Sequence, residues 1–369
     1  MKVPQFDLTR QYEQIESEIQ SALRHVLRGG QFVLGPEGEA FEAECAAYLG
    51  VSHAIGVGSG SDAIKLVLQG LGVGRDTEVV TPAFSFVASA TAALELGARP
   101  VFVDVEPATL TLDPDRVADA ITPRTRVILA VHLYGLPAAM GPLRVLADAR
   151  GVALVEDAAQ AFGAMLGGRP IGGQGRAAAF SFYPTKNLAA YGDAGLITTT
   201  DAALATRLRR ARNHGQTQKY RHVELGWTAR LDELQAAILR VKLRHLPEWT
   251  RARQAVAARY SAGFAGLPLV LPAERPGAVH VFHQYTVRTP RRDGLATHLA
   301  AAGIGTACHY PLPIPAQPLF QELGYDAEAF PAAWAAAREV LSLPCFPELR
   351  SDEIDAVIAA VRAFFEGDH

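Results

Sequence analysis

Between residues 53 and 199, short apolar runs alternate with segments of helical periodicity, and this alternation most limits what the chain can fold into. The apolar runs lie at 54–57, 78–81, 100–104, 127–132, 152–156, 178–183 and 195–199. Helical patterns near 62–70, 84–96, 114–120 and 139–149 separate the first five runs. Strands separated by helices of this length predict crossover connections. The expected fold class is therefore α/β, with a mixed, mostly parallel sheet.

Helical patterns flank this region on both sides. Before it we expect helices over 11–27 and 37–49, and after it a long helix from Arg230 to about 259. Beyond that helix we expect a strand over 282–287, a helix over 294–302 and a closing helix over 351–365 with Ser351 as its N-cap. The long helix can join two domains. We therefore divide the chain into a large domain, residues 1–250, and a small C-terminal α+β domain, residues 251–369.

Composition excludes several classes of protein. Of the 369 residues, 49% are hydrophobic and 20% are charged, so the chain can bury a large core and is neither disordered nor fibrous. A net charge of -3, without long runs of one sign, argues against a nucleic-acid partner. The apolar stretches are too short to span a membrane, and residues 1–20 lack a signal core. Cys45, Cys308 and Cys345 form neither a disulfide framework nor a metal site. We expect a cytoplasmic protein.

Ligands of open α/β sheets bind beyond the carboxyl ends of the strands, so the residues there are candidates for chemistry. After the first strand, Gly58-Ser59-Gly60-Ser61-Asp62-Ala63 leads directly into a helix. The start of this helix offers free N–H groups and the positive end of the helix dipole, which suit a phosphate. Taken alone, this segment is explained equally well as an ordinary strand-to-helix turn built from Gly and Ser. It is neither a Walker loop nor a full dinucleotide fingerprint.

Two charged residues follow later strands. Asp157 directly follows the run 152–156. A carboxylate buried at the end of a strand needs a partner such as a protonated ring nitrogen; facing solvent or capping a helix is the ordinary alternative. Lys186 follows the run 178–183 among aromatic, Pro and Gly residues, whereas the other four lysines, Lys2, Lys65, Lys219 and Lys242, are interpreted as surface charges. Enclosure lowers the pKa of an amine and makes it a nucleophile able to form a Schiff base.

The three loops together match one cofactor. A phosphate cradle, a carboxylate for a ring nitrogen and a Schiff-base lysine are what proteins supply to pyridoxal 5′-phosphate. With these loops the chain resembles the DegT-type aminotransferases that act on nucleotide-linked keto sugars and have the aspartate aminotransferase fold, fold type I. The likeness extends over nearly the whole chain and is also carried by 81–86, 192–195, 230–237 and 341–344.

The resemblance implies a transaminase. An amino acid, L-glutamate in most of the family, converts the cofactor to pyridoxamine 5′-phosphate, and the keto sugar then accepts the amino group. Lys186 would carry the cofactor and move protons, and Asp157 would pair with its ring nitrogen. Phe86 would stack on the ring, with core packing at a helix start as the alternative. Gln160 would lie near the ring hydroxyl, and Ser181, with residues 60–62, would hold the phosphate.

Further implications concern the substrate and the partner subunit. Tyr183, Tyr310 and His309 are candidates for the sugar pocket; either tyrosine can equally be structural, and for His309 a structural role is favoured. The family forms homodimers with shared active sites. Thr228 stands where the family usually has an Asn that reaches the neighbouring subunit's phosphate, and a threonine reaches less far.

The position of amination and the class of function have alternatives. Within the family, lysine rather than histidine at the position of Lys186 favours transamination over dehydration. Family members with a sequence such as Gly192-Asp193-Ala194-Gly195 resemble makers of 3-amino sugars, so the resemblance implies amination at C-3 rather than C-4 of the hexose. A pyridoxal phosphate-binding regulatory protein without turnover is one alternative. A nicotinamide dehydrogenase is another, disfavoured because no acidic residue closes the next strand, where a ribose would need one.

Overall fold

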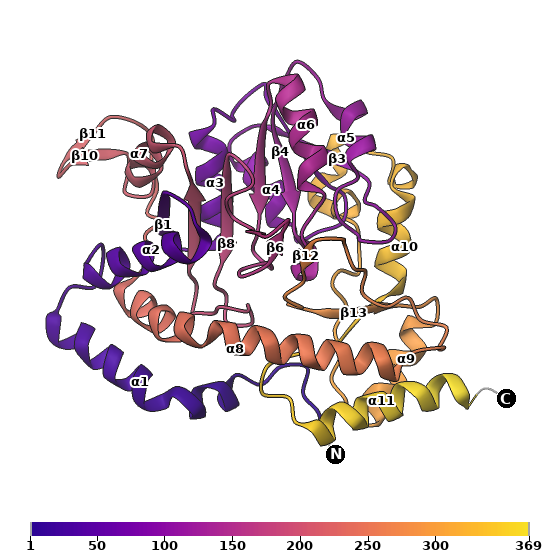
Figure 1. The fold of residues 1–369 in the computed structure, drawn as a ribbon. Coiled ribbons are helices and arrows are strands. Elements are labelled where there is room, and N and C mark those ends of the chain that lie inside the picture. Colours follow the sequence, from indigo (N-terminus) through magenta and orange to yellow (C-terminus); the bar gives the residue numbers. More distant parts are fainter. Residues whose placement is uncertain (1, 368–369) are drawn as a thin grey trace.

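The computed structural model describes residues 2–367, and its centre is a seven-stranded sheet of order β1-β9-β8-β5-β4-β2-β3 (Figure 1). The strands are β1 (His53–Val57), β2 (Glu78–Pro82), β3 (Arg99–Val103), β4 (Thr125–Val131), β5 (Ala153–Asp157), β8 (Ala177–Ser181) and β9 (Gly195–Thr199). β9 is antiparallel to both β1 and β8, and the other neighbouring strands are parallel. The α/β prediction and the positions of the seven strands are confirmed.

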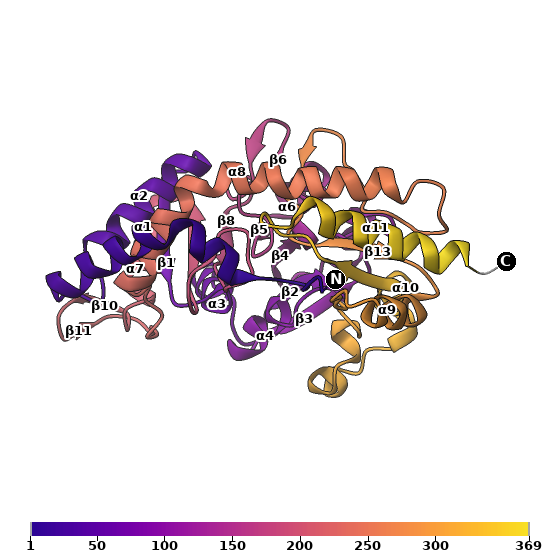
Figure 2. The same cartoon turned by 90° about the horizontal axis from the view of Figure 1, so that it is seen from below.

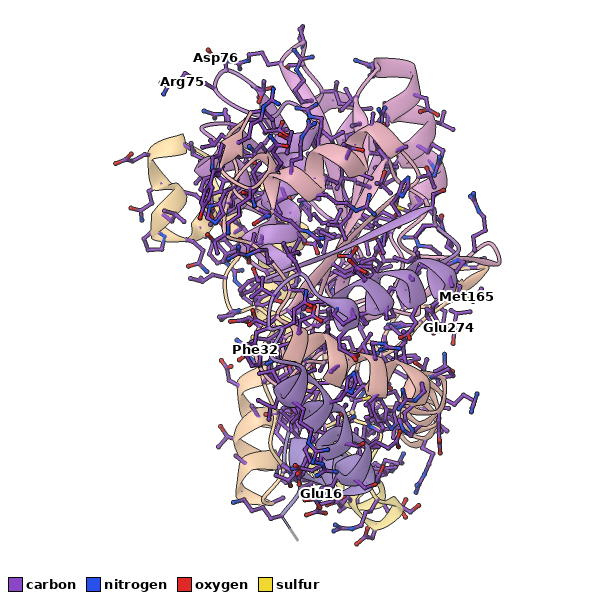
Figure 3. The ribbon with its side chains drawn as sticks, turned by 90° about the vertical axis from the view of Figure 1, so that its left-hand side faces the viewer. Glu16, Phe32, Arg75, Asp76, Met165 and Glu274 are labelled. Carbon is purple, nitrogen blue, oxygen red and sulfur yellow. The ribbon has the colours of Figure 1, made fainter. Side chains whose placement is uncertain are left out.

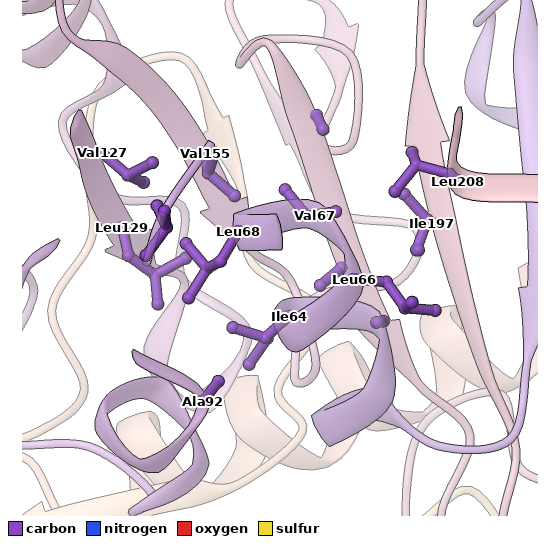
Figure 4. Packing of buried hydrophobic residues seen from close by; sticks show 14 of the residues in the cluster. Ile64, Leu66, Val67, Leu68, Ala92, Val127, Leu129, Val155, Ile197 and Leu208 are labelled. Carbon is purple, nitrogen blue, oxygen red and sulfur yellow. The ribbon is translucent and has the colours of Figure 1, made fainter. Parts of the chain in front are cut away.

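Helices cover both faces of this sheet, which explains why its strands are apolar along their whole length. α3 (Gly60–Gly70), α4 (Ala88–Glu95) and α7 (Ala202–Ala211) share a core with one face. Figure 4 shows Leu68 of α3 beside Val127 and Leu129 of β4. The intervening Ile128 of β4 faces the core of α5 (Pro114–Ala120) and α6 (Met140–Arg150).

α8 (Glu233–Gly263) is the longest helix of the described chain and runs below the sheet, with α1 (Leu8–Gly29) and α2 (Pro36–Leu49) beside it (Figures 1 and 2). Its second half packs in a separate core with α9 (Arg292–Ala301), α11 (Ser351–Glu366) and the antiparallel pair β13 (Tyr285–Arg288) and β14 (Val340–Leu343). Val3 belongs to that core too. α8 passes through position 250 without a break, and the proposed boundary there stays a prediction.

Several local details differ from expectation. α7 and α10 (Pro331–Glu339) were not predicted, and α4 begins at Ala88, so Phe86 precedes it. Ser351 is the first residue of α11 rather than its N-cap; Arg350 is the N-cap, and its N–H donates to Glu353 Oε2 at 2.9 Å. The Glu at the third helical position thus accepts a hydrogen bond from the backbone N–H of the N-cap residue, as in a capping box.

Short pairings complete the fold. β6 (Met165–Leu166) pairs with β7 (Arg169–Pro170) and β12 (Ala278–Val279), and β10 (Gln216–Gln218) pairs with β11 (Arg221–His222). The turn at Arg75 and Asp76 marks one end of the molecule and Glu16 of α1 lies near the other (Figure 3). Over residues 2–367 no helix is long and apolar enough to cross a membrane. Within the same range no group of His, Cys, Asp and Glu side chains could hold a metal ion.

Candidate active site

The carboxyl ends of β1, β5 and β8 lie at one edge of the sheet, where β9 begins. There the turn after β1 meets the end of β8: a Cβ built on Gly60 would lie 2.7 Å from Ser181 Cβ and 3.2 Å from its Oγ. Only a glycine fits so closely. The N–H groups of Gly60 and Ser61 lie in the first turn of α3, which has no intrahelical acceptors for them. Together with the Ser181 hydroxyl they are donors suited to a phosphate.

Ser59 caps α3 and engages Asp62. Its Oγ accepts a hydrogen bond from the Asp62 N–H at 3.0 Å and donates one to Asp62 Oδ2 at 2.9 Å. The Asp62 N–H, expected at the phosphate, is therefore already bonded within the turn. Gly60 and Ser61 are left as the backbone donors of this loop.

Asp157 is the last residue of β5 and is 5% exposed. Its Oδ1 accepts a hydrogen bond from the Ala159 N–H at 3.2 Å. Burial raises the pKa of this carboxyl, while the Ala159 hydrogen bond and the charge of Lys186 lower it. A buried carboxylate with so little support is costly unless a positive group faces it. The position therefore suits a protonated ring nitrogen.

Lys186 lies in the loop between β8 and β9, where its N–H donates to Tyr183 O at 2.8 Å. Burial lowers the pKa of its amine to about 8, and the negative charge of Asp157 opposes that shift. An amine with this pKa has a substantial neutral fraction near pH 7 to 8 and is a capable nucleophile. The structure therefore brings a nucleophile, Lys186, into electrostatic contact with Asp157.

Lys242 contradicts the expectation that the other lysines are surface charges. It is 1% exposed on α8, and its Nζ lies 4.0 Å from the centre of the Tyr191 ring. Burial lowers its pKa to about 8 as well, with Glu348 as the opposing charge. Helical periodicity does not reveal that Tyr191, from the loop after Lys186, covers this amine. Lys186 is distinguished from it by having Asp157 as its charged neighbour.

Gln160 and Tyr310, far apart in sequence, meet at the same edge. Gln160 Nε2 donates to Tyr310 OH at 3.1 Å, and its Oε1 accepts from the Tyr134 N–H at 2.6 Å. The Tyr310 ring centre lies 6.0 Å from that of Phe86, whose side chain is 53% exposed. Core packing does not explain so exposed a ring. Phe86 is therefore free to stack on a bound ligand.

Two histidines lie close enough to Lys186 for its positive charge to lower their pKa. His309 Nδ1 lies 2.9 Å from Ser342 Oγ, and burial together with Lys186 lowers its pKa. His283 was not predicted: it is buried, its Nδ1 has no partner among the described residues, and burial and then Lys186 hold its pKa well below the usual range. It lies at the start of an apolar run, which carries no chemical signal.

His132 and Glu156 were not assigned roles from the sequence, and they form a buried pair beside Asp157. His132 Nε2 lies 3.3 Å from Glu156 Oε2, while the Ala138 N–H donates to His132 Nδ1 at 2.9 Å. Glu156 also accepts hydrogen bonds from three N–H groups of the loop 172–175. This network anchors the end of β5. Examination of the residue that ends the run 127–132 would have found His132.

Two predicted residues lie at the surface. Tyr183 is exposed and is the second residue after the end of β8. Thr228 is exposed, and its Oγ1 lies 3.1 Å from His214 Nε2. Within one subunit its hydroxyl thus contacts His214 and does not join Gly60, Ser61 and Ser181 as a donor for the phosphate. Whether Thr228 serves a neighbouring subunit stays a prediction.

A sequence model of the DegT/DnrJ/EryC1/StrS aminotransferase family matches residues 13–362. The chain belongs to this family. It is described as an aminotransferase family, so the resemblance and the prediction of an enzyme are confirmed.

Relatives of this DegT-family chain cover its whole length. It is 49% identical to dTDP-3-amino-3,4,6-trideoxy-alpha-D-glucose transaminase from Streptomyces venezuelae, over 99% of this chain and 97% of the relative. It is 47% identical to a protein from Geobacillus stearothermophilus named pleiotropic regulatory protein, over 99% of both chains.

Solved structures superpose closely on this chain, which confirms the fold expectation. DesV from S. venezuelae, in complex with a ketimine intermediate, matches with a TM-score of 0.97 and 49% identity over 99% of each chain. NtdA from Bacillus subtilis with bound cofactor PMP matches with a TM-score of 0.91 and 31% identity, over 99% of this chain and 85% of that one.

Proposed function

We propose that this protein is a pyridoxal phosphate-dependent aminotransferase that moves the amino group of L-glutamate to C-3 of a nucleotide-linked keto hexose. The observation that carries the proposal is the position of the desolvated amine of Lys186 within electrostatic range of the buried carboxylate of Asp157, beside the Gly60–Ser181 cradle. The name of the S. venezuelae relative, a transaminase of a 3-amino sugar, supports amination at C-3. It also favours C-3 over the alternative, C-4.

The residues present fit this cofactor. Gly60, Ser61 and Ser181 would hold its phosphate, and the buried Asp157 would keep a proton on its ring nitrogen. When bound, pyridoxal phosphate acts as an electron sink for the carbon that loses its proton. Lys186, whose pKa of about 8 lets it both accept and donate a proton near neutral pH, would move that proton.

The remaining predicted residues would complete the pocket. Phe86 would stack on the cofactor ring and Gln160 would lie near its hydroxyl. Tyr183, Tyr310 and His309 would line the sugar side. We further propose a homodimer in the cytoplasm, in which Thr228 serves the site of the other copy.

Steady-state kinetics test the proposal. With L-glutamate and a panel of 3-keto and 4-keto nucleotide sugars, double-reciprocal plots should give parallel lines, because one site takes both substrates in turn. The 3-keto sugars should give the higher kcat/KM. Intersecting lines would contradict the mechanism. A protein that binds the cofactor but shows no spectral change with any amino acid would instead support a regulatory function, as the name of the Geobacillus relative suggests.

Gly60→Ala is expected to weaken cofactor binding. The new Cβ would lie 2.7 Å from Ser181 Cβ, so the turn after β1 must move away from the end of β8, and the phosphate donors on these two segments move apart. We expect Kd for pyridoxal phosphate, measured by fluorescence titration, to rise by about tenfold or more, the effect of losing one charge-assisted hydrogen bond. Gly141→Ala in α6 is the control, since a Cβ there meets no atom within 4 Å. Equal affinities for both variants would refute the assigned cradle.

The pKa of Lys186 predicts how cofactor capture depends on pH. Only the neutral amine attacks an aldehyde, so capture by cofactor-free protein should accelerate about tenfold per pH unit below pH 8 and level off above it. Stopped-flow absorbance gives this profile. A rate that still climbs steeply beyond pH 9.5 would show a lysine with an ordinary pKa and contradict its desolvation.

A further inference from the structure

We propose that Tyr134 is a positioning residue that joins the cofactor side of the site to its sugar side, by fixing Gln160 and the segment 309–310. The inference deepens the proposed function and concerns a residue that no sequence motif singled out. Tyr134 follows β4 and is 7% exposed. Its φ of 58° lies in the left-handed region that a tyrosine rarely adopts. A strained, buried conformation of this kind persists only where the surroundings hold it, and it often marks a functional position.

The backbone of Tyr134 fixes the orientation of Gln160. Its N–H donates to Gln160 Oε1 at 2.6 Å, so the amide nitrogen must face the other way, toward Tyr310 OH at 3.1 Å. Because an amide nitrogen only donates, Tyr310 OH accepts this bond, and its own proton is left to donate elsewhere. Burial raises the pKa of Tyr310, which keeps that proton on the phenol. Tyr134 thus determines that Tyr310 presents a donor to the pocket.

The side chain of Tyr134 fixes the position of that donor. Tyr134 OH donates to the carbonyl oxygen of His309, the residue before Tyr310. His309 is held on its other side, with Nδ1 2.9 Å from Ser342 Oγ on β14. The same tyrosine therefore holds both Gln160, at the end of β5, and the segment that carries Tyr310.

The neighbouring backbone strengthens this connection. Gln284 N–H donates to Tyr134 O at 3.3 Å and Val281 N–H donates to Gly135 O at 3.2 Å. A Cβ on Gly135 would lie 2.8 Å from Val281 Cγ2, and the φ of Gly135 is 98°, so a glycine is needed there. The turn 134–135 is thus held between the segment that follows β5 and the segment that leads into β13.

Tyr134→Phe removes the hydrogen bond to His309 and keeps the ring. Tyr260→Phe is the matched control, because Tyr260 OH is also buried and donates to a backbone carbonyl, that of Pro344, at 2.9 Å. Hydrogen exchange of the full-length protein should be at least about fivefold faster over 306–312 in Tyr134→Phe and unchanged there in Tyr260→Phe. Unchanged exchange over 306–312 in Tyr134→Phe would overturn the inference. This readout does not depend on any activity, so it separates failure of this inference from failure of the proposed function.

Kinetics provide the second readout. We expect KM for the keto sugar to rise about tenfold in Tyr134→Phe while the rate of the glutamate half-reaction changes less than about twofold, since Tyr310 is proposed to line the sugar side of the site. If Tyr134 acts through Tyr310, the double variant with Tyr310→Phe should be no worse than Tyr310→Phe alone. If the effects of Tyr134→Phe and Tyr310→Phe on KM multiply in the double variant, the inference is overturned. It is also overturned if Tyr134→Phe leaves KM unchanged, as we expect for Tyr260→Phe.

Discussion

Replacement of Lys186 by Ala is expected to lower turnover by more than about 10⁴-fold and to remove the visible absorption band that the lysine-bonded cofactor gives. The side chain supplies both the amine that bonds to the cofactor and the group that moves the proton. Spectra of the purified variant and wild type, before and after addition of L-glutamate, measure both effects. Wild type should be yellow and should bleach with glutamate.

Lys242→Ala is the control for this experiment, because Lys242 is the second buried lysine with a pKa lowered to about 8. It should keep the band and the bleaching even if its melting temperature falls. Loss of the band in Lys242→Ala but not in Lys186→Ala would exchange the roles of the two amines. Wild type that stays colourless with added pyridoxal phosphate would contradict the cofactor itself.

Asp157→Asn is expected to lower the rate of the glutamate half-reaction by about 10²-fold or more while leaving the protein folded. Asparagine has nearly the same shape, but it lacks the negative charge that keeps a proton on a ring nitrogen. Without that proton the ring withdraws electrons less well. Single-turnover absorbance with L-glutamate measures the rate, and the cofactor band should move in wavelength because its protonation changes.

Asp104→Asn separates this effect from a loss of stability. Asp104 is another buried carboxylate after a strand of the same sheet, and it accepts hydrogen bonds from the N–H groups of Ala332 and Ala333, each at 2.9 Å. Its replacement should lower the melting temperature and leave the half-reaction rate within about threefold. If the two variants lose rate equally, Asp157 is a structural residue.

The strands could be located from the sequence because each is apolar throughout and bounded by turn residues. The reversed direction of β9 could not be read in the same way, since a buried strand has the same pattern in either direction. Lys242 was misjudged for a related reason: periodicity shows which side chains share a face of α8, but not that Tyr191 covers that face.

The candidate site was predictable where its residues follow strands in sequence, as Gly60, Asp157 and Lys186 do. Tyr134 was missed because its role arises from contacts with Gln160 and His309, and His309 is 175 positions away. His283 was missed because an apolar run surrounds it. Motif reading finds groups that are local in the chain, whereas positioning residues are defined by the packing.

The participation of Val3 in the C-terminal core has a consequence for biosynthesis. Val3 N–H donates to Gly303 O at 2.9 Å and Gly305 N–H donates to Val3 O at 2.8 Å, so Val3 is synthesised long before the residues to which it bonds. The seven-stranded sheet is complete in sequence by Thr199 and can form before these partners are made. This core, which also includes Val361, therefore closes only after the strands of the sheet have been synthesised, and a bulky group attached next to Val3 would delay that closure without hindering the sheet.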